Sequence, residues 1–391
     1  MIESYRGRFP LLSKSNIHYF DYAATSPIPD VVIDEWVRYQ SEVGVFVGKG
    51  GGVLSHSAEG KFFEAEDTLR NFFSAGPDDY LIYGKNVTEL INILALSLRS
   101  HIRPMDVIMV GPYEHHSNLL PWKYLAKERN AIFLELPIGK DGEPDYEYIS
   151  SIPGNLRIFS FSAISNANSF HFDICKALEY LPKDCLIFED DSQLVAHRRL
   201  YRHDRVMCHF VPSHKMYGPK NIAGALIRPE LSCILEPVLL GGGMVDYSGF
   251  KDTWKQGASS FLAGTYDIGL IAAWAAACNF MMDISFPNIE KWENHIGSKI
   301  ENFLNGNSNF RNLAFAGDGA LFSFVHERIH AHDIAHILSE RDIIVRAGHL
   351  CATGTMRKSD VHAITRISIG IGVDDNDVDA LLQAMGDLNG Y

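Results

Sequence analysis

Lys215 stands where a covalent anchor for a carbonyl compound would be expected. An apolar run at 206–211 predicts a strand, Ser213 and His214 begin the loop after it, and 224–227 predicts the next strand. Ligands of α/β proteins bind beyond the carboxyl ends of strands. A lysine amine that is held there and partly desolvated can form a Schiff base. From its position alone, Lys215 could also be a solvated residue of the turn.

A second predicted strand, at 186–189, ends in three consecutive acids. These are Glu189, Asp190 and Asp191, with Gln193 shortly after them. Carboxylates at the end of a strand can bind a metal ion, a ribose or a protonated ring nitrogen. They can also cap a helix by accepting hydrogen bonds from its free N–H groups. The pattern allows one acid to cap while another does chemistry.

Two further loops carry imidazole and thiol groups. His115 and His116 follow a predicted strand, which favours a binding surface or an imidazole stacked on an aromatic ligand. Cys351 lies in a glycine-containing loop near Arg346 and His349. A thiol near cationic groups is expected to be nucleophilic, whereas a small buried apolar residue is the alternative.

The elements that must position these side chains alternate between short apolar runs and amphipathic stretches. This alternation predicts βαβ units and an α/β fold with a mostly parallel sheet. Strands that are buried on both faces explain why the apolar runs lack polar alternation. The predicted strands are 107–110, 131–136, 157–162, 186–189 and 206–211, with helices such as 121–129 and 173–180 between them.

The pattern changes near residue 283, where an α+β arrangement begins. We predict a large domain at 15–282 and a smaller C-terminal domain at 283–391, with residues 1–14 packing on the latter. The apolar run at 268–282 is too short to span a bilayer and predicts a buried helix. The expected C-terminal elements are a surface helix at 289–304, strands at 320–325, 343–346 and 365–369, and helices at 332–340 and 373–388.

Composition limits the classes of function. The chain has 391 residues, 46% of them hydrophobic, and a formal net charge of −13. These values are typical of a soluble globular protein and unfavourable for binding nucleic acid or an anionic membrane. The 6 cysteines form no CxxC pair, which indicates free thiols in a reducing compartment. The start of the chain lacks the apolar stretch of a secretion signal, so we expect a cytoplasmic protein without nucleic-acid or membrane partners.

Together these segments resemble the class V aminotransferase family. The matching segments occur in the same order as in the family, and the resemblance extends from Tyr19 to Gly370. Within the family, the chain is most similar to cysteine desulfurases and selenocysteine lyases, which use pyridoxal 5′-phosphate (PLP). It implies PLP-dependent transferase fold type I, a large α/β/α domain with a mostly parallel sheet plus a smaller α+β C-terminal domain. The matching segments are YFDYAATSPIP (19–29), EHHSNLLPW (114–122), the Asp-x-x-Gln of EDDSQ (189–193), SHKMYGPK (213–220), GGGM (241–244), FLAGT (261–265) and RAGHLC (346–351).

The resemblance implies a role for each residue around the cofactor ring. Lys215 matches the lysine that holds the cofactor as a Schiff base and moves the α-proton of the substrate. Asp190 matches the acid that keeps the pyridinium nitrogen protonated. Gln193 matches a ligand of the phenolic oxygen of the ring, and Asn166 lies at a second such position close to the substrate. His115 matches the histidine that stacks on the ring and takes part in catalysis.

The resemblance also implies contacts to phosphate, substrate and sulfur. Thr88 and His214 match phosphate contacts, and Thr265 matches one that a partner subunit supplies, which implies a homodimer. Arg366 matches the arginine that binds the α-carboxylate of the amino-acid substrate, a bidentate task that suits a guanidinium group. Cys351 matches the cysteine that attacks the sulfur of the substrate.

The implied reaction removes sulfur from L-cysteine, leaves a persulfide on Cys351 and releases alanine, with a sulfur-acceptor protein as a further expected partner. β-Elimination by a C–S lyase, giving pyruvate and ammonia without need of Cys351, stays open. Transamination, decarboxylation or another PLP reaction on a pathway-specific amino acid also stays open. A catalytically silent relative is not favoured, because Lys215, Asp190 and Arg366 are all present.

Several positions depart from the family pattern. Pro212 replaces a serine and residues 86–89 read Asn-Val-Thr-Glu, so two phosphate hydroxyls are lost and backbone N–H groups at a helix start must contribute more. Leu350 replaces a second histidine before the cysteine. Residues 47–57 replace a histidine-containing pocket segment, although His56 lies nearby. The altered pocket keeps the identity of the substrate open.

Two segments resemble motifs that are typical of other functions. Residues 326–330 spell HExxH, but a zinc protease needs this motif on a helix, and here a predicted strand leads straight into it. The glycines at 241–243 lack the lysine and hydroxyl of a P-loop and the spacing of a dinucleotide-binding motif. We therefore expect neither a metal site nor a nucleotide site of these kinds.

Overall fold

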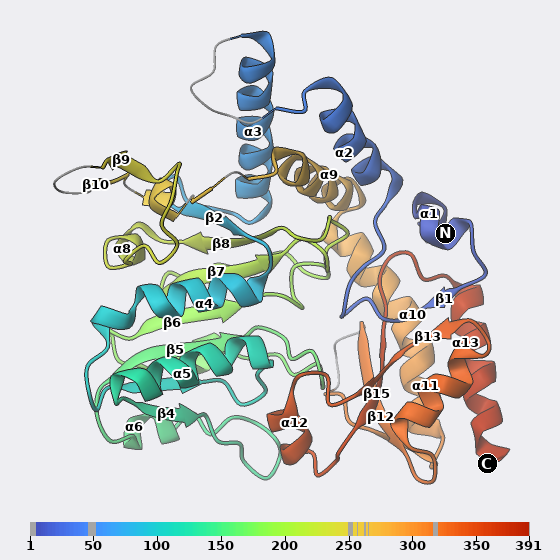
Figure 1. The fold of residues 1–391 in the computed structure, drawn as a ribbon. Helices are drawn as coiled ribbons and strands as arrows, with labels where there is room; N and C mark the ends of the chain where they lie inside the picture. The colour runs from blue at the N-terminus through green and yellow to red at the C-terminus, as the bar shows by residue number, and fades with distance from the viewer. Residues whose placement is uncertain are drawn as a thin grey trace.

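A seven-stranded sheet, ordered β2-β8-β7-β6-β5-β3-β4, forms the centre of this computed structural model (Figure 1). The structure describes residues 5–45, 52–248, 253–255, 257–261, 263–264, 266–315 and 320–390. Strands β3 to β7 are parallel to their neighbours within that group, whereas β8 runs antiparallel to β2 and β7. The predicted α/β fold with a mostly parallel sheet is therefore confirmed. The strands are β2 (Tyr80–Gly84), β3 (Val107–Val110), β4 (Ile132–Glu135), β5 (Leu156–Ser162), β6 (Leu186–Asp190), β7 (Val206–Pro212) and β8 (Ala223–Ile227).

Helices cover both faces of this sheet (Figure 1). On one face, α4 (Val87–Ser97) and α5 (Leu120–Arg129) bury the phenyl ring of Phe188 and its apolar neighbours. On the other face, α3 (Val53–Phe72) and α9 (Ile268–Ile284) contribute to a second large apolar cluster. The two layers leave the carboxyl ends of the parallel strands available for ligands.

Helix α9 is apolar because it lies in the core. Most of its residues are buried, which confirms the buried helix predicted at 268–282. Within the described ranges, no single helix is long and apolar enough to cross a membrane. Helices α9 and α10 (Phe286–Gly306) meet that test only as a pair bent by 76°.

A four-stranded antiparallel sheet, ordered β11-β12-β15-β14, forms the C-terminal part together with α10, α11 and α13. The single strand predicted at 343–346 is wrong. The chain changes partner there, since β13 pairs with the N-terminal β1 and β14 pairs with β15. Helix α10, predicted as a surface helix, also has a buried face. The elements are β1 (His18–Tyr19), β11 (Phe310–Asn312), β12 (Leu321–His326), β13 (Ile343–Ile344), β14 (Arg346–Gly348), β15 (Ile364–Ser368), α11 (Ala331–Ser339), α12 (Thr353–Lys358) and α13 (Asp375–Asp387).

The N-terminal segment contacts both parts of the molecule. Phe9 is fully buried against Tyr217 of the large part, in an apolar cluster that also includes residues of α13. Arg6 donates two hydrogen bonds to Asp377 of α13, at 2.7 and 2.9 Å. The core is thus continuous between the two parts, and the division into two domains stays a prediction. The remaining elements are α1 (Pro10–Ser13), α2 (Asp30–Glu42), α6 (Tyr148–Ser151), α7 (Ile174–Leu178), α8 (Pro229–Ser232), β9 (Val245–Tyr247) and β10 (Thr253–Trp254).

Gly370, just after β15, lies against two buried tyrosine rings. A Cβ atom there would lie 2.4 Å from Tyr22 Cδ1 and 2.8 Å from Tyr217 Oη. We expect Gly370→Ala to lower the free energy of unfolding by about 1–3 kcal/mol, because overpacking forces these rings to move. Gly386→Ala in α13 is the control, since its Cβ meets no atom within 4 Å. Urea unfolding measures both variants, and a wild-type midpoint for Gly370→Ala would contradict this packing.

Candidate active site

A pocket opens at the carboxyl ends of β5, β6 and β7 and collects the predicted site residues. Thr265 lies outside the described residues, as do residues 47–51 of the altered pocket segment, whereas residues 53–57 begin helix α3. All other predicted site residues line the pocket, namely Thr88, His115, Asn166, Asp190, Gln193, His214, Lys215, Cys351 and Arg366.

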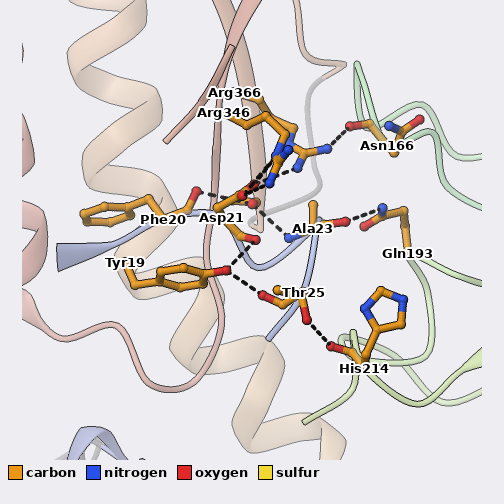
Figure 2. A network of polar contacts seen from close by, with 11 residues as sticks. Tyr19, Phe20, Asp21, Ala23, Thr25, Asn166, Gln193, His214, Arg346 and Arg366 are labelled. Atoms are coloured by element: carbon orange, nitrogen blue, oxygen red, sulfur yellow. Dashed lines mark hydrogen bonds and ion pairs between the residues drawn. The ribbon is translucent and has the colours of Figure 1, made fainter. Parts of the chain in front are cut away.

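Lys215 lies in the turn after β7, and the chain at residues 25 and 26 holds that turn. The backbone carbonyl of His214 accepts hydrogen bonds from the Ser26 N–H at 2.8 Å and from the Thr25 hydroxyl at 3.2 Å (Figure 2). Burial lowers the pKa of Lys215 to about 8, although the charge of Asp190 acts in the opposite direction. A sizeable fraction of this amine is therefore neutral and nucleophilic near neutral pH.

Asp190 and His115 give the pocket a carboxyl group and a neutral imidazole. One oxygen of Asp190 accepts the Ser192 N–H at 3.0 Å. Burial raises the pKa of Asp190, and the hydrogen bond from Ser192 and the charge of Lys215 oppose that rise. Burial, followed by the charge of Lys215, lowers the pKa of His115 to about 3, so the imidazole is uncharged. A carboxylate suits the protonated nitrogen at the edge of a heterocycle, and a neutral imidazole suits the face of that ring.

The two amide side chains of the pocket already make hydrogen bonds. Gln193 donates to the Ala23 carbonyl at 2.9 Å, and Asn166 donates to the Leu350 carbonyl at 2.9 Å. The Asn166 Oδ1 atom is buried and has no hydrogen-bond partner in the part of the chain that the structure describes. A buried acceptor without a partner is costly, so Asn166 is suited to a ligand that donates a hydrogen bond.

Helix α4 presents an anion site at its N-terminus. Asn86 caps the helix by accepting the Glu89 N–H, and the first residues of the helix, Val87 and Thr88, line the pocket. The Thr88 hydroxyl lies 2.6 Å from the Ser117 hydroxyl, and both residues line the pocket. Ser117 directly follows the two histidines but was not among the predicted site residues. It brings a hydroxyl to a site that lacks two of the hydroxyls of the family pattern. Hydroxyls at a helix start suit a phosphate group.

Arg366 of β15 is buried and already paired. It donates to Asp21 at 2.9 Å and to the Asn166 carbonyl at 2.9 Å (Figure 2), while its Nε has no partner among the described residues. Arg346 donates to Oδ2 of the same Asp21 from Nε at 2.9 Å and from Nη2 at 2.6 Å, and its Nε also donates to Oδ1 at 3.1 Å. Two guanidinium groups thus share one carboxylate, and the net positive charge suits a carboxylate ligand. The sequence analysis did not single out Asp21, although it lies in the opening motif.

Cys351 is exposed at the rim of the pocket on a strained but anchored loop. Leu350 and Cys351 have φ of +52° and +54°, in the left-handed region that non-glycine residues avoid. The Asn166 side chain donates to the Leu350 carbonyl, and the His116 N–H donates to the Cys351 carbonyl at 2.7 Å. The His116 ring lies 3.0 Å from the Thr353 hydroxyl. These hydrogen bonds hold the backbone of the loop in its strained conformation.

The HExxH segment does not form a metal-binding helix. His326 ends strand β12, and its Nδ1 accepts the N–H groups of Arg328 and Ile329. Helix α11 begins only at Ala331, with the side chain of His330 as its N-terminal cap. His326 and His330 therefore do not share a helix face. This agrees with the sequence analysis, which predicts a strand leading into the segment.

The geometry is that of a fold type I PLP enzyme, and comparison with known proteins places it further. Residues 18–381 match the family "Aminotransferase class-V". The chain therefore belongs to the class V aminotransferase family. It is 30% identical to a probable cysteine desulfurase of Halalkalibacterium halodurans, over 96% of this chain and 95% of that protein. It is 28% identical to a probable cysteine desulfurase of Pseudomonas aeruginosa, over 97% of this chain and 96% of that protein.

Solved structures agree with this assignment. The apo cysteine desulfurase of Thermococcus onnurineus NA1 superimposes with a TM-score of 0.92 at 26% identity, over 100% of both chains. The cysteine desulfurase CsdA of Escherichia coli superimposes with a TM-score of 0.91 at 25% identity, over 99% of this chain and 98% of that one. The fold expected from the resemblance is confirmed, and the function is like that of cysteine desulfurases.

Loss of the His116–Thr353 contact is expected to loosen the Cys351 loop. We predict that His116→Ala speeds amide hydrogen exchange in residues 346–356 by about fivefold, because one hydrogen bond contributes about 1 kcal/mol. Thr353→Val should do the same, and the double variant should add nothing. Thr353→Ser keeps the hydroxyl and serves as the control. Unchanged exchange in His116→Ala, measured by mass spectrometry, would refute the anchoring role.

Proposed function

We propose that this protein is a PLP-dependent cysteine desulfurase. It takes sulfur from L-cysteine, releases alanine and carries the sulfur as a persulfide on Cys351. The observation that carries the proposal is that the Cys351 thiol and the Lys215 amine line one pocket with Asp190 and Arg366. The relationship to cysteine desulfurases over 96% of the chain supports it.

The residues present fit the cofactor group by group. The Lys215 amine, whose pKa is lowered, suits the aldehyde, and the buried Asp190 suits the ring nitrogen. The neutral His115 suits the ring face. The hydroxyls of Thr88 and Ser117 at the start of α4 suit the phosphate. When bound, PLP withdraws electrons from the α-carbon of an amino acid.

The side chains of this protein then divide the remaining work. Lys215 anchors the cofactor and moves the α-proton of the substrate, because a partly desolvated amine can act as base and acid. Arg366 and Arg346 bind the α-carboxylate through their net positive charge. Cys351, as the thiolate, forms a bond from its Sγ to the sulfur of the substrate while the carbon–sulfur bond breaks. The electron pair of the broken bond stays on the carbon, which takes up a proton and becomes the methyl group of alanine, and the sulfur remains on the protein.

We further propose that the protein acts as a cytoplasmic homodimer and passes its sulfur to an acceptor protein. Exposed large apolar side chains on α2 and α3, which protrude from the large part (Figure 1), support an interface between copies. They include Trp36, Val37, Leu54 and Phe63. The exposed position of Cys351 supports delivery of sulfur to a second protein.

Product analysis with L-cysteine separates this function from its alternatives. Wild-type protein loaded with PLP should give alanine and a protein persulfide. Cys351→Ala should lose at least about 100-fold of that activity, because its nucleophile is gone, while keeping the visible absorption of the cofactor. Cys175→Ala removes another exposed free thiol and is the matched control. Pyruvate and ammonia, formed equally by wild type and Cys351→Ala, would instead establish a C–S lyase.

The lowered pKa of Lys215 predicts how the apo-protein captures PLP. Only the neutral amine is nucleophilic, so capture should accelerate as pH rises through about 8, by about tenfold from pH 7 to 9. Stopped-flow absorbance measures the rate. Lys215→Ala should abolish the visible band, whereas Lys220→Ala, at the nearest other lysine in the sequence, should retain it. A midpoint at the ordinary lysine pKa, or a band in Lys215→Ala, would contradict the assignment.

A further inference from the structure

Three ionisable side chains meet inside the sheet directly behind Asp190. Glu189 and Asp191 flank Asp190 in the sequence, and side chains alternate along an extended chain, so both lie on the face opposite to Asp190. His209 of β7 is in register with Glu189. Its Nδ1 lies 2.9 Å from Asp191 Oδ2 and 3.6 Å from Glu189 Oε2. We refer to Glu189, Asp191 and His209 as the triad.

The triad is too deeply buried to hold two full negative charges. The exposed fraction is 0% for Asp191 and His209 and 7% for Glu189. One polar atom from each of the three side chains lies within 4.8 Å of the other two, and two buried carboxyl groups this close favour holding at least one proton. Burial, followed by the charge of Asp191, raises the pKa of Glu189, and burial lowers the pKa of His209 to about 4. His209 is therefore neutral, and its Nδ1 lies nearer to Asp191 than to Glu189. Asp191 is thus the carboxyl group better placed to carry a charge, and Glu189 the one to hold the proton.

The surroundings neutralise this charge only in part. Burial, followed by the charge of Asp190, raises the pKa of Asp191. The guanidinium group of Arg202 opposes that rise, but it also pairs with Asp79. Asp191 Oδ1 and His209 Nε2 are buried and have no hydrogen-bond partner within the described ranges. The other ionisable groups that act on the triad are Asp190 from β6, Cys208 from β7 and, from the flanking loops, Arg202, Asp79 and Arg228.

We propose that the triad holds one negative charge and one shared proton behind Asp190, and that it thereby sets how firmly Asp190 keeps the ring nitrogen of the cofactor protonated. The proposal rests on the proposed function, in which Asp190 binds that nitrogen. A negative charge on Asp191 favours a proton on any cation that Asp190 binds. The proton on Glu189 prevents a further charge from forming beside Asp190. The three residues act through Asp190 and are positioning residues.

The pH titration of the ring-nitrogen NMR signal of bound PLP, labelled with nitrogen-15, tests the proposal. Glu189→Gln keeps the size and the donor, so the midpoint should stay at the wild-type value. The double variant E189Q/D191N removes the charge and should lower the pH at which the ring nitrogen loses its proton by about one unit. Asp204→Asn removes an exposed acid from the loop between β6 and β7 and is the matched control. A folded double variant with the wild-type midpoint would leave a structural role only and overturn the proposal.

A second measurement does not need the cofactor. Nitrogen NMR of the apo-protein, with His209 assigned by comparison with His209→Gln, should show a neutral imidazole with its proton on Nδ1 down to about pH 5. A protonated ring at neutral pH would overturn the proposal. If the wild type takes up no PLP, the proposed function fails, and this NMR signal still tests the triad.

Elemental analysis distinguishes proton sharing from metal binding. One donor atom from each of the three side chains lies within 4.8 Å of the others, a spacing that a metal ion could also use. We expect no bound zinc after purification, because Glu189 holds a proton and Arg202 offsets part of the remaining charge. One equivalent of zinc that disappears in E189Q/D191N would identify a metal site and overturn the proposal.

Discussion

Asp21 joins two guanidinium groups that would otherwise repel each other, the buried one of Arg366 and the half-exposed one of Arg346. Arg346 of β14 lies directly opposite Arg366 of β15, and like charges in that position destabilise a sheet. Burying a guanidinium group without a partner is costly as well. Asp21 accepts hydrogen bonds from both arginines. The C-terminal sheet and the N-terminal segment therefore depend on one carboxylate.

The segment that carries Asp21 positions both sides of the pocket. The hydroxyl of Ser368 on β15 accepts the Ala23 N–H, which fixes the segment to the C-terminal sheet. Three residues further on, Ser26 donates to the His214 carbonyl and fixes the turn that bears Lys215. One short stretch of chain thus sets the distance between the amine and the arginines. A substrate that bridges them must match that distance.

Except for β2, which the sequence analysis does not predict, the strands of the large sheet could be predicted from the sequence because their signals are local. Several site residues, Thr88, Asn166 and Arg366 among them, follow only from the resemblance to the family. Apolar runs marked the parallel strands, and the rule that ligands bind at the carboxyl ends of such strands brought Lys215 and Asp190 together. The pairing of Asp21 with the arginines could not be predicted, because more than 320 residues separate them. The break between β13 and β14 was missed for the same reason, since each strand owes its form to a distant partner.

The state of the Cys351 loop constrains how sulfur leaves under the proposed function. Two consecutive residues in the left-handed region cost free energy, and contacts to His116 and Asn166 offset that cost only in this one conformation. Since Cys351 is exposed at the pocket rim, the acceptor must approach the pocket. The surface around His116, which holds the loop, is then also the surface that the acceptor meets.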